Sequence, residues 1–147
     1  MKVNGTADIA RTREAIFDRL LDPQFLKRCI PGCESIEEVA PGSYKTVVKS
    51  GVGAVRGSFK GTAVISDVVR PESYTLSVEG KSTVGHVRSV AALRLEEIDS
   101  GTRLHYQGEA KISGLLARVG GRLLEPAAQK VAGEFFERLA AELAQTA

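Results

Sequence analysis

The chain contains no tryptophan, one methionine and only two cysteines among its 147 residues. Two thiols are too few for a disulfide scaffold, so the fold has to rest on a hydrophobic core. The first residues lack the apolar stretch of a signal peptide, and no apolar run approaches the roughly 18 residues that span a membrane. These absences predict a cytoplasmic protein whose cysteines stay reduced.

Long runs of one charge are also absent. The 20 basic and 18 acidic residues give a net charge of +2 and are dispersed along the chain, which argues against a nucleic-acid partner. The hydrophobic content of 43% is typical of a globular protein. At this length there is room for one sizeable core, so we expect a single domain over residues 1–147.

The chain opens with a pattern for one strand and two short helices. Residues 2–10 alternate between apolar and polar side chains, which is the period of a half-buried strand. Thr12 is placed to cap a first helix, and Asp22 followed by Pro23 is a start signal for a second. The turn at 30–32 then ends the second helix.

Residues 34–112 predict six further antiparallel strands, because alternating segments are separated by turn signals rich in Gly, Pro, Asp and Ser. Glycine recurs on the inward face of these strands, at positions 57, 61, 80 and 108. Inward glycines weaken a flat sheet but allow bends and close backbone approach, so they favour a strongly curved sheet.

The last segment, 115–145, predicts a long helix. Its apolar stripe has helical spacing and consists of Leu116, Leu123, Ala127, Val131, Phe135 and Leu139. Gly120, Gly121 and Pro126 should loosen or bend the start of this helix. The predicted fold class is therefore α+β: a curved antiparallel seven-stranded sheet wrapped around a long C-terminal helix, with two short helices between strands one and two.

Groups suited to catalysis or metal binding are scarce on the inward face. His86 and His105 fall on the same face as several arginines, which indicates a solvated surface rather than a general base. Cys29 and Cys33 lack the further ligands of a zinc site, and we interpret them as small thiols flanking a turn. The glycine run 51–57 lacks the Lys-Ser/Thr ending of a phosphate loop. We predict no catalytic residue, no metal and no cofactor.

A few hydroxyls among apolar neighbours resemble a small-molecule pocket more than a reaction centre. The inward candidates are the hydroxyls of Tyr44, Tyr74, Ser89 and Tyr106, with Thr46 if the face of Tyr44 is the inner one. Each tyrosine could equally be a rim residue with a solvated hydroxyl. The alternation of the strands and the helical spacing of the last segment place one set of side chains between sheet and helix. This placement predicts a cavity lined by Val48, Phe59, Ala63, Leu76, Val78, Ser89, Ala91, Leu93, Tyr106, Leu116, Leu123, Ala127 and Val131. We place its portal at the loosened helix start, Gly120 and Gly121, with the turn at Ile30 and Pro31 as the alternative.

Two stretches carry a family resemblance: residues 29–36, Cys-Ile-Pro-Gly-Cys-Glu-Ser-Ile, and residues 51–61, Gly-Val-Gly-Ala-Val-Arg-Gly-Ser-Phe-Lys-Gly. Both are similar to hallmark segments of the CoxG family, named for the CoxG subunit of carbon monoxide dehydrogenase, within the START/Bet v1-like helix-grip (SRPBCC) superfamily. The similarity extends over essentially the whole chain, and it implies the fold described above.

The resemblance also implies a function. Members of the superfamily hold lipids, quinones, polyketides or other apolar molecules between sheet and helix. The CoxG resemblance implies a partner, either a molybdenum-containing carbon monoxide dehydrogenase or related hydroxylase, or its assembly machinery, with a role in recruitment or in delivery of the electron acceptor. Longer members continue into a linker and an apolar anchor, whereas this chain stops at Ala147. We therefore expect at most peripheral contact with the inner face of the membrane.

Three functions stay open from the sequence. The first is a binding or carrier module for an apolar small molecule, lipid-like or quinone-like. The second is an enzyme of the polyketide cyclase or dehydratase kind, for which Tyr44 and Tyr106 are the candidate acids or bases. The third is an assembly factor whose cavity is vestigial. The residues favour the first, because an isolated tyrosine with a pKa near 10 is a weak catalyst at neutral pH.

Overall fold

The computed structural model describes residues 1–52 and 55–145. Its elements follow the order expected from the sequence, with seven strands, two short helices after the first strand and a long helix at the end. The elements are β1 (Lys2–Ile9), α1 (Arg13–Leu20), α2 (Pro23–Cys29), β2 (Cys33–Ala40), β3 (Ser43–Val52), β4 (Val55–Val69), β5 (Ser73–Ser82), β6 (Gly85–Ile98), β7 (Gly101–Ser113), η1 (Leu115–Val119) and α3 (Gly121–Gln145).

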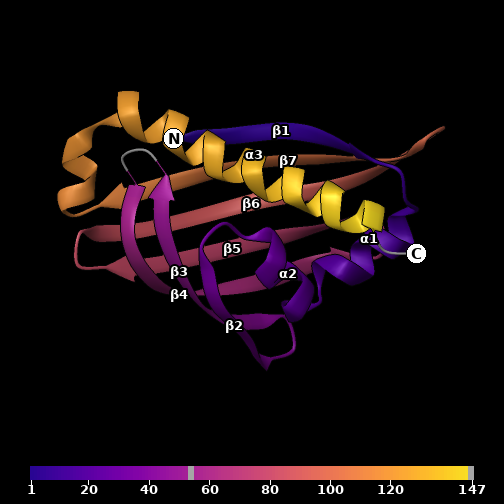
Figure 1. Ribbon diagram of the computed structural model, residues 1–147, viewed down its shortest axis with the longest axis horizontal. Coiled ribbons are helices and arrows are strands. Elements are labelled where there is room, and N and C mark those ends of the chain that lie inside the picture. The colour runs from indigo at the N-terminus through magenta and orange to yellow at the C-terminus, as the bar shows by residue number, and fades with distance from the viewer. Residues whose placement is uncertain (53–54, 146–147) are drawn as a thin grey trace.

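The strands form one antiparallel sheet in the order β1-β7-β6-β5-β4-β3-β2. From β2 to β7, each strand pairs with the strand that follows it in the sequence. β1 pairs with β7 and forms the edge of the sheet opposite β2. Figure 1 shows the sheet curving around α3, with α1 and α2 beneath the C-terminal end of that helix. The predicted α+β fold with its curved seven-stranded sheet is confirmed.

Local sequence signals set the ends of the short helices as expected. The hydroxyl of Thr12 accepts a hydrogen bond from the backbone N–H of Ala15 at 3.3 Å, which caps α1. The carboxylate of Asp22 accepts from the N–H of Gln24 at 3.0 Å, and Pro23 occupies the first turn of α2.

The curvature of the sheet depends on glycine where two strands approach closely. Gly61 on β4 lies opposite Gly80 on β5. A Cβ atom added to Gly61 would lie 2.0 Å from the carbonyl oxygen of Glu79, a distance that no side chain tolerates. Glycine at this inward position is therefore a condition for the bend, as the sequence pattern indicated. The expected glycine turn at 51–57 includes residues 53–54, which lie outside the described residues.

The start of the long helix differs from the prediction. Residues 115–119 form a 3₁₀ turn, Gly120 has φ +90°, and α3 begins only at Gly121. Glycine adopts a φ of +90° readily, whereas most other residues do not. Gly120 therefore separates two helical segments, η1 and α3, instead of lying within a single weakened helix. Within α3 the expected stripe, with residues every fourth position, drifts around a helix of 3.6 residues per turn, so in the first turn Leu124 is buried and Leu123 is exposed.

Buried side chains form two clusters of unequal size. The larger cluster lies between the sheet, α1, α2 and the second half of α3, and includes Phe17, Phe25, Leu104, Leu139 and Leu143. The smaller one lies near η1, and its buried members are Phe59, Leu116 and Leu124. We call the two ends of the molecule after their helices: the α1 end comprises residues 8–25, 67–73, 94–103 and 134–145, and the η1 end comprises residues 1–3, 47–52, 55–60, 79–89 and 109–125.

Candidate ligand-binding site

The side chains predicted to line a cavity fall into three groups by exposure. Fully buried are Phe59, Leu93, Tyr106, Leu116 and Ala127. Half-buried are Val48, Ala63, Leu76, Val78, Ser89, Ala91 and Val131. Leu123 is 60% exposed and faces away from the interior, so its assignment to the cavity was wrong. Its neighbour Leu124 takes the inward position beside Phe59 and Leu116.

Most of the half-buried group lies on the central strands β4, β5 and β6. The second half of α3 packs on the inward face, where Phe136 and Leu139 share a buried cluster with Leu93 of β6. Val78 on β5 and Ala91 on β6 are partly accessible, although they share the inward face with these buried residues. An accessible apolar surface under a helix is what a binding space between sheet and helix requires. The cavity itself remains a prediction.

A hollow of about 370 Å³ lies at the start of α3, lined by Gly121, Arg122, Glu125, Pro126 and Gln129. It includes Gly121, one of the four residues predicted for the portal. The other predicted side of the portal, Ile30 and Pro31, is half-buried after α2. All five lining residues are exposed residues of α3, so the hollow lies on the solvent side of that helix, and the portal remains a prediction.

A second hollow, of about 650 Å³, lies on the outer face of the sheet. Lys45, Lys60, Glu79 and Lys81 line it, and Lys60 lies directly opposite Lys81 on the neighbouring strand. This groove is separated from the inward face by the sheet itself. Nothing in the sequence pattern pointed to it.

Gln129 is the polar residue of the site that sequence reasoning missed. Its amide nitrogen donates to the carbonyl of Asn4 at 2.9 Å, and its amide oxygen accepts from the N–H of Asn4 at 3.3 Å. The same nitrogen donates to the hydroxyl of Tyr106 at 3.3 Å. Gln129 thus ties α3 to the edge strand β1 and to β7. Periodicity gave no signal for it, because the residue lies beside the apolar stripe rather than in it.

Tyr106 lies flat against the helix. Its ring stacks on Phe136 of α3 with a centroid distance of 4.1 Å and an interplanar angle of 16°. Its hydroxyl lies over Gly5, where an added Cβ would come within 2.4 Å of the phenol oxygen. Glycine at position 5 therefore leaves room for the Tyr106 hydroxyl at the seam between β1 and α3.

The other two tyrosines have structural partners. Tyr44 is buried and donates from its hydroxyl to the carbonyl of Leu21 at 3.0 Å, which ties β3 to the end of α1. Burial, with the nearby Glu38, raises the pKa of Tyr44 to about 12. Tyr74 packs edge-on against Phe17, and burial raises its pKa as well. Both phenols keep their protons at neutral pH, so neither is suited to accept one.

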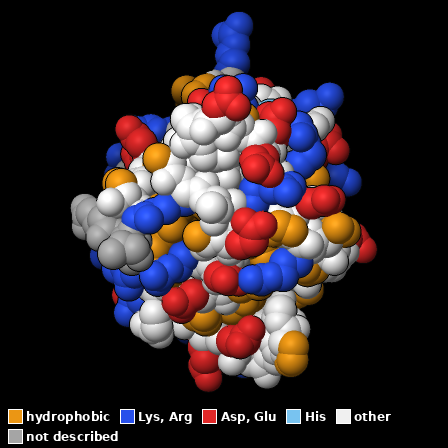
Figure 2. Space-filling model, turned by 90° about the vertical axis from the view of Figure 1, so that its right-hand side faces the viewer, with side chains coloured by type: hydrophobic (Ala, Val, Ile, Leu, Met, Phe, Trp, Pro, Cys, Tyr) orange, Lys and Arg blue, Asp and Glu red, His pale blue; other side chains and the backbone are white. Residues whose placement is uncertain are grey.

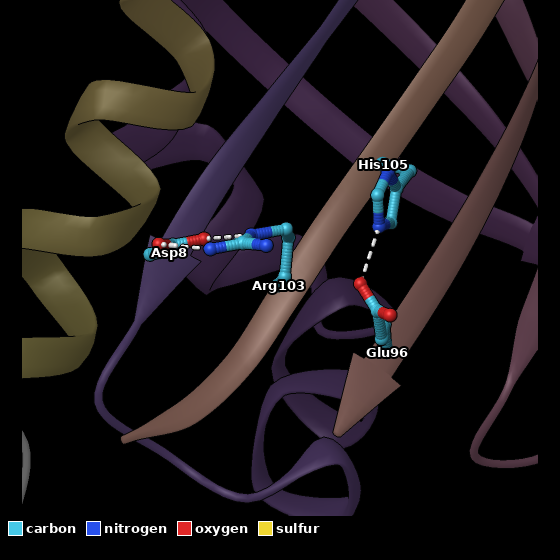
Figure 3. Close-up of polar contacts among 4 residues, drawn as sticks. All are labelled: Asp8, Glu96, Arg103 and His105. Atoms are coloured by element: carbon cyan, nitrogen blue, oxygen red, sulfur yellow. Dashed lines mark hydrogen bonds and ion pairs between the residues drawn. The ribbon is translucent and has the colours of Figure 1, made fainter. Parts of the chain in front are cut away.

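Both histidines lie on the outer face of the sheet, as predicted. His105 lies 2.9 Å from a carboxylate oxygen of Glu96, and His86 lies 3.0 Å from one of Glu79. Figure 3 shows the first pair beside a bidentate contact in which Arg103 donates to Asp8 at 2.8 and 3.1 Å. These contacts hold the pKa of the Glu96 and Asp8 carboxyl groups below their usual range. The four residues drawn in Figure 3 are partly exposed strand residues, so the cluster is a solvated surface network.

The cysteines behave as the small structural thiols expected. Cys29 is fully buried, and burial raises its pKa to about 11. Cys33 is half-buried, with its pKa also raised by burial, and its thiol donates to the carbonyl of Ser35 at 3.4 Å. A raised pKa disfavours the reactive thiolate. Within residues 1–52 and 55–145 no group of His, Cys, Asp and Glu side chains is arranged to hold a metal ion.

The curved sheet with two short helices and a long helix along its inner face defines a helix-grip, Bet v1-like protein. Solved structures share this fold over the whole chain. Ara h 8.0201 matches with a TM-score of 0.70 at 13% identity, covering 99% of both chains. Protein Ms6760 from Mycobacterium smegmatis matches with a TM-score of 0.68 at 19% identity, covering 99% of this chain and 92% of the other.

The model of the family described as the CoxG subunit of carbon monoxide dehydrogenase matches residues 5–144, and the chain belongs to this family. A conserved protein from Geobacillus kaustophilus is 30% identical, with a TM-score of 0.93 and coverage of 99% of this chain and 96% of that one. No curated protein matches. Among the described residues, no helix combines the length and apolar character needed to cross a bilayer.

Proposed function

We propose that the protein is a non-catalytic binding or carrier module for an apolar small molecule, lipid-like or quinone-like, held between the sheet and α3. The observation that carries this proposal is the accessible apolar surface at the middle of the inward face, exemplified by Val78 and Ala91. Val78 is not a member of either buried cluster, and Ala91 lies at the margin of the larger one, so this part of the inward face is less tightly covered than Leu93 and Leu95. Membership of the CoxG family and the helix-grip fold support a ligand-binding accessory role.

The energetics suit a carrier. Burial of hydrocarbon contributes about 0.8 kcal/mol per CH₂ group, so ten such groups contribute about 8 kcal/mol. This is comparable to the free-energy cost of losing translational and rotational freedom on binding. The ligand would then be held with moderate affinity and exchanged readily, which a carrier requires and a tightly bound cofactor does not.

The family description suggests the partner. We propose that the module is accessory to a molybdenum-containing carbon monoxide dehydrogenase or a related hydroxylase, or to its assembly machinery, and delivers an electron acceptor or recruits the enzyme. We place it in the cytoplasm, with membrane contact of the peripheral kind at most. Support for this step comes from the family match and not from the geometry of the site.

The binding space is tested by filling it. Ala91→Phe adds a large side chain to the inward face of β6, whereas Ala92→Phe adds the same side chain to the outer face one residue later. A fluorescent apolar probe should bind Ala91→Phe at least about tenfold more weakly than wild type, and Ala92→Phe as wild type does. Val78→Phe on β5 repeats the test if Ala91→Phe does not fold.

Two results would count against the carrier proposal. One is full probe affinity in a folded inward variant. The other is a native mass spectrum, of protein purified without detergent, that shows no retained apolar molecule while the probe also fails to bind. The second outcome would favour an assembly factor with a vestigial cavity.

The enzyme alternative rests on few groups. The hydroxyl of Tyr44 is engaged by the Leu21 carbonyl and its pKa is raised, which leaves Tyr106 at the inward face. His86→Ala and His105→Ala should leave function unchanged, because both side chains lie on the outer face. Loss of function in either variant, with the fold intact by circular dichroism, would reopen a catalytic mechanism.

A further inference from the structure

The outer face of the sheet carries a band of basic side chains that includes the groove described above. The pairing of β2 to β7 aligns outward side chains in two adjacent rows across the sheet, and these rows contain Lys45, Lys60, Lys81, Arg88 and Lys111. Within these described strands, the same two rows hold two carboxylates, Glu37 and Glu79. Five basic residues against two acidic ones is a larger positive surplus than the net charge of +2 of the whole chain. The positive charge of the protein is therefore concentrated on this face.

Three of these lysines are brought close together by the register of the strands. Lys60 on β4 lies directly opposite Lys81 on β5. Lys45 on β3 lies opposite Thr62, two residues beyond Lys60, and is therefore a diagonal neighbour of Lys60. Cβ atoms are about 5 Å apart in an opposite pair and roughly 7 Å apart in a diagonal pair, so the three ammonium groups reach one small volume. Like charges placed opposite one another destabilise a sheet, and an anion bound between them offsets that cost.

Glu79 lies next to these lysines, but its charge is already shared among several cations. One carboxylate oxygen of Glu79 lies 3.0 Å from the imidazole of His86. The same oxygen lies 3.9 Å from both Lys81 and Arg88. A single carboxylate offsets only part of the charge of these neighbours, so the band keeps positive charge that an external anion can neutralise.

The groove itself has the size and the donor groups of a small-anion site. Its volume of about 650 Å³ is within the range of small-molecule pockets. Ser35 and Thr62 add hydroxyl groups, which can donate hydrogen bonds to phosphate oxygens, to the lysines that line the groove. Lys45 and Lys60 form no salt bridge within residues 1–52 and 55–145, and neither does Glu37, which lies opposite Lys45. Cationic and hydroxyl donors thus meet in one hollow.

We propose that the outer groove is a second binding site, which takes a small soluble anion with two or more linked phosphate groups. Lys60 and Lys81 hold one phosphate between them, and Lys45, with its Cβ roughly 7 Å from that of Lys60, is placed to hold the next. Lysine binds phosphate as a compact point charge on a flexible stem, which suits a site formed by side chains of an open sheet. This ligand differs in chemical class from the apolar ligand of the inward face, and the sheet separates the two sites. The proposal therefore does not depend on the carrier function.

Binding is measured by isothermal titration calorimetry with inorganic pyrophosphate at low ionic strength. We expect saturable binding to the wild type, with an affinity that falls as salt is raised. Inorganic phosphate should bind at least about tenfold more weakly, because a single phosphate group engages fewer of the lysines. Lys60→Gln with Lys81→Gln should weaken pyrophosphate binding at least about tenfold, since each charge-assisted contact contributes about that factor.

A matched control and a stability measurement separate loss of binding from loss of structure. Lys27→Gln with Lys130→Gln removes the same charge at exposed positions outside the groove and should bind pyrophosphate within about twofold of wild type. The groove variant should be at least as stable to urea as the wild type at low salt, because it removes the repulsion between two opposite lysines. Saturating pyrophosphate should stabilise the wild type and the control, but not the groove variant.

Three results would overturn the proposal: no saturable binding of pyrophosphate to the wild type, equal losses in the groove and control variants, or equal affinities for phosphate and pyrophosphate. If a hexaglutamate peptide binds in a lysine-dependent manner while pyrophosphate does not bind, the groove is a contact for an acidic protein segment and the phosphate proposal is wrong. Pyrophosphate should leave binding of the fluorescent apolar probe unchanged, and displacement of the probe would contradict a site on the outer face. A probe that fails to bind even the wild type would count against the carrier function alone.

Discussion

The two ends of the molecule differ in how their side chains are used. At the α1 end, Leu139 and Leu143 of α3 are fully packed, and charges are paired, as in Arg103 with Asp8 and Arg13 with Glu97. Figure 2 views this end and shows acidic and basic side chains intermixed over the surface. At the η1 end three buried residues form the local core, leucines are exposed, and arginines next to them have no acidic partner in the described chain.

This difference indicates that one helix serves two purposes along its length. The second half of α3 contributes Phe136, Leu139 and Leu143 to the larger buried cluster, whereas its first turn contributes Leu124 to the smaller one, next to the hollow at Gly121. Regions with few buried contacts open at lower free energy than the global fold does. For the proposed carrier, this division would place a stable scaffold at one end and the predicted entrance at the other. The following predictions test that division, from the largest expected effect to the smallest.

The largest expected effect is a difference in stability between alanine variants of two leucines in α3. Leu139→Ala empties a fully buried position at the α1 end and should lower the free energy of unfolding by about 2–5 kcal/mol. Leu123→Ala removes a side chain that is 60% exposed and should change it by less than about 0.5 kcal/mol. Urea denaturation of both variants provides the measurement. Similar losses would mean that the start of α3 is packed as tightly as its end.

The second prediction concerns the pH dependence of stability in the larger buried cluster, which includes Cys29. The pKa of Cys29 is raised from 9.0 to about 11 in the folded protein, chiefly by burial, so the unfolded chain releases this proton first. The stabilisation is complete below about pH 9 and is lost as the pH rises toward 11, a change on the order of 2 kcal/mol. Tyr44, with its pKa raised to about 12, acts in the same direction at higher pH.

Denaturation near pH 8 and near pH 11 tests the Cys29 contribution. The stability difference between wild type and Cys29→Ala should shrink over this interval, because the variant lacks the group that titrates. Cys33→Ala, at a half-buried thiol, should show a smaller change. A difference between wild type and Cys29→Ala that stays constant with pH would contradict the assigned burial effect.

The outcome of sequence reasoning also differs between the two ends. Alternation with period two predicted all seven strands, because a sheet with one covered face imposes that period on every strand. Capping residues predicted both short helices, because each cap bonds to backbone groups only two or three residues away, as the hydrogen bonds of Thr12 and Asp22 show. At the α1 end the helical stripe also held, with Leu139 buried as expected.

The prediction was least accurate at the η1 end. A stripe with residues every fourth position assigned Leu123 to the interior, but such a stripe drifts around α3, and Leu124 lies on the buried face instead. The break at Gly120 was also not predicted. A glycine in a helical pattern is tolerated in some helices and ends others, so periodicity alone does not identify the break. Gln129 was missed because its partners are backbone groups of Asn4, more than a hundred residues away in the sequence. Such long-range polar contacts leave no local pattern.

The third prediction addresses that contact. Gln129→Ala removes the hydrogen bonds that tie α3 to Asn4 and Tyr106 and should lower the free energy of unfolding by about 1 kcal/mol. Hydrogen exchange at the Asn4 amide should become faster, while exchange in the second half of α3 stays as in wild type. Lys130→Ala, at the next, exposed position, is the matched control. Unchanged exchange at Asn4 would mean that packing, and not Gln129, holds the start of α3 to the sheet.

The smallest effect on stability, and the most direct test of the entrance, is expected at Gly121. This residue begins α3 outside the left-handed region, and an added Cβ would meet nothing within 4 Å. Gly121→Ala should therefore raise the free energy of unfolding by about 0.4–1 kcal/mol, because alanine lowers the conformational entropy of the unfolded chain. Because it stiffens the first turn of α3 without touching the inward face, uptake and release of a fluorescent apolar probe should both slow while the equilibrium affinity stays the same.

Gly120→Ala is the informative comparison, since its φ of +90° makes alanine strained there and should destabilise the protein. Unchanged probe kinetics in a stable Gly121→Ala variant would move the entrance away from the start of α3, to the turn at Ile30 and Pro31.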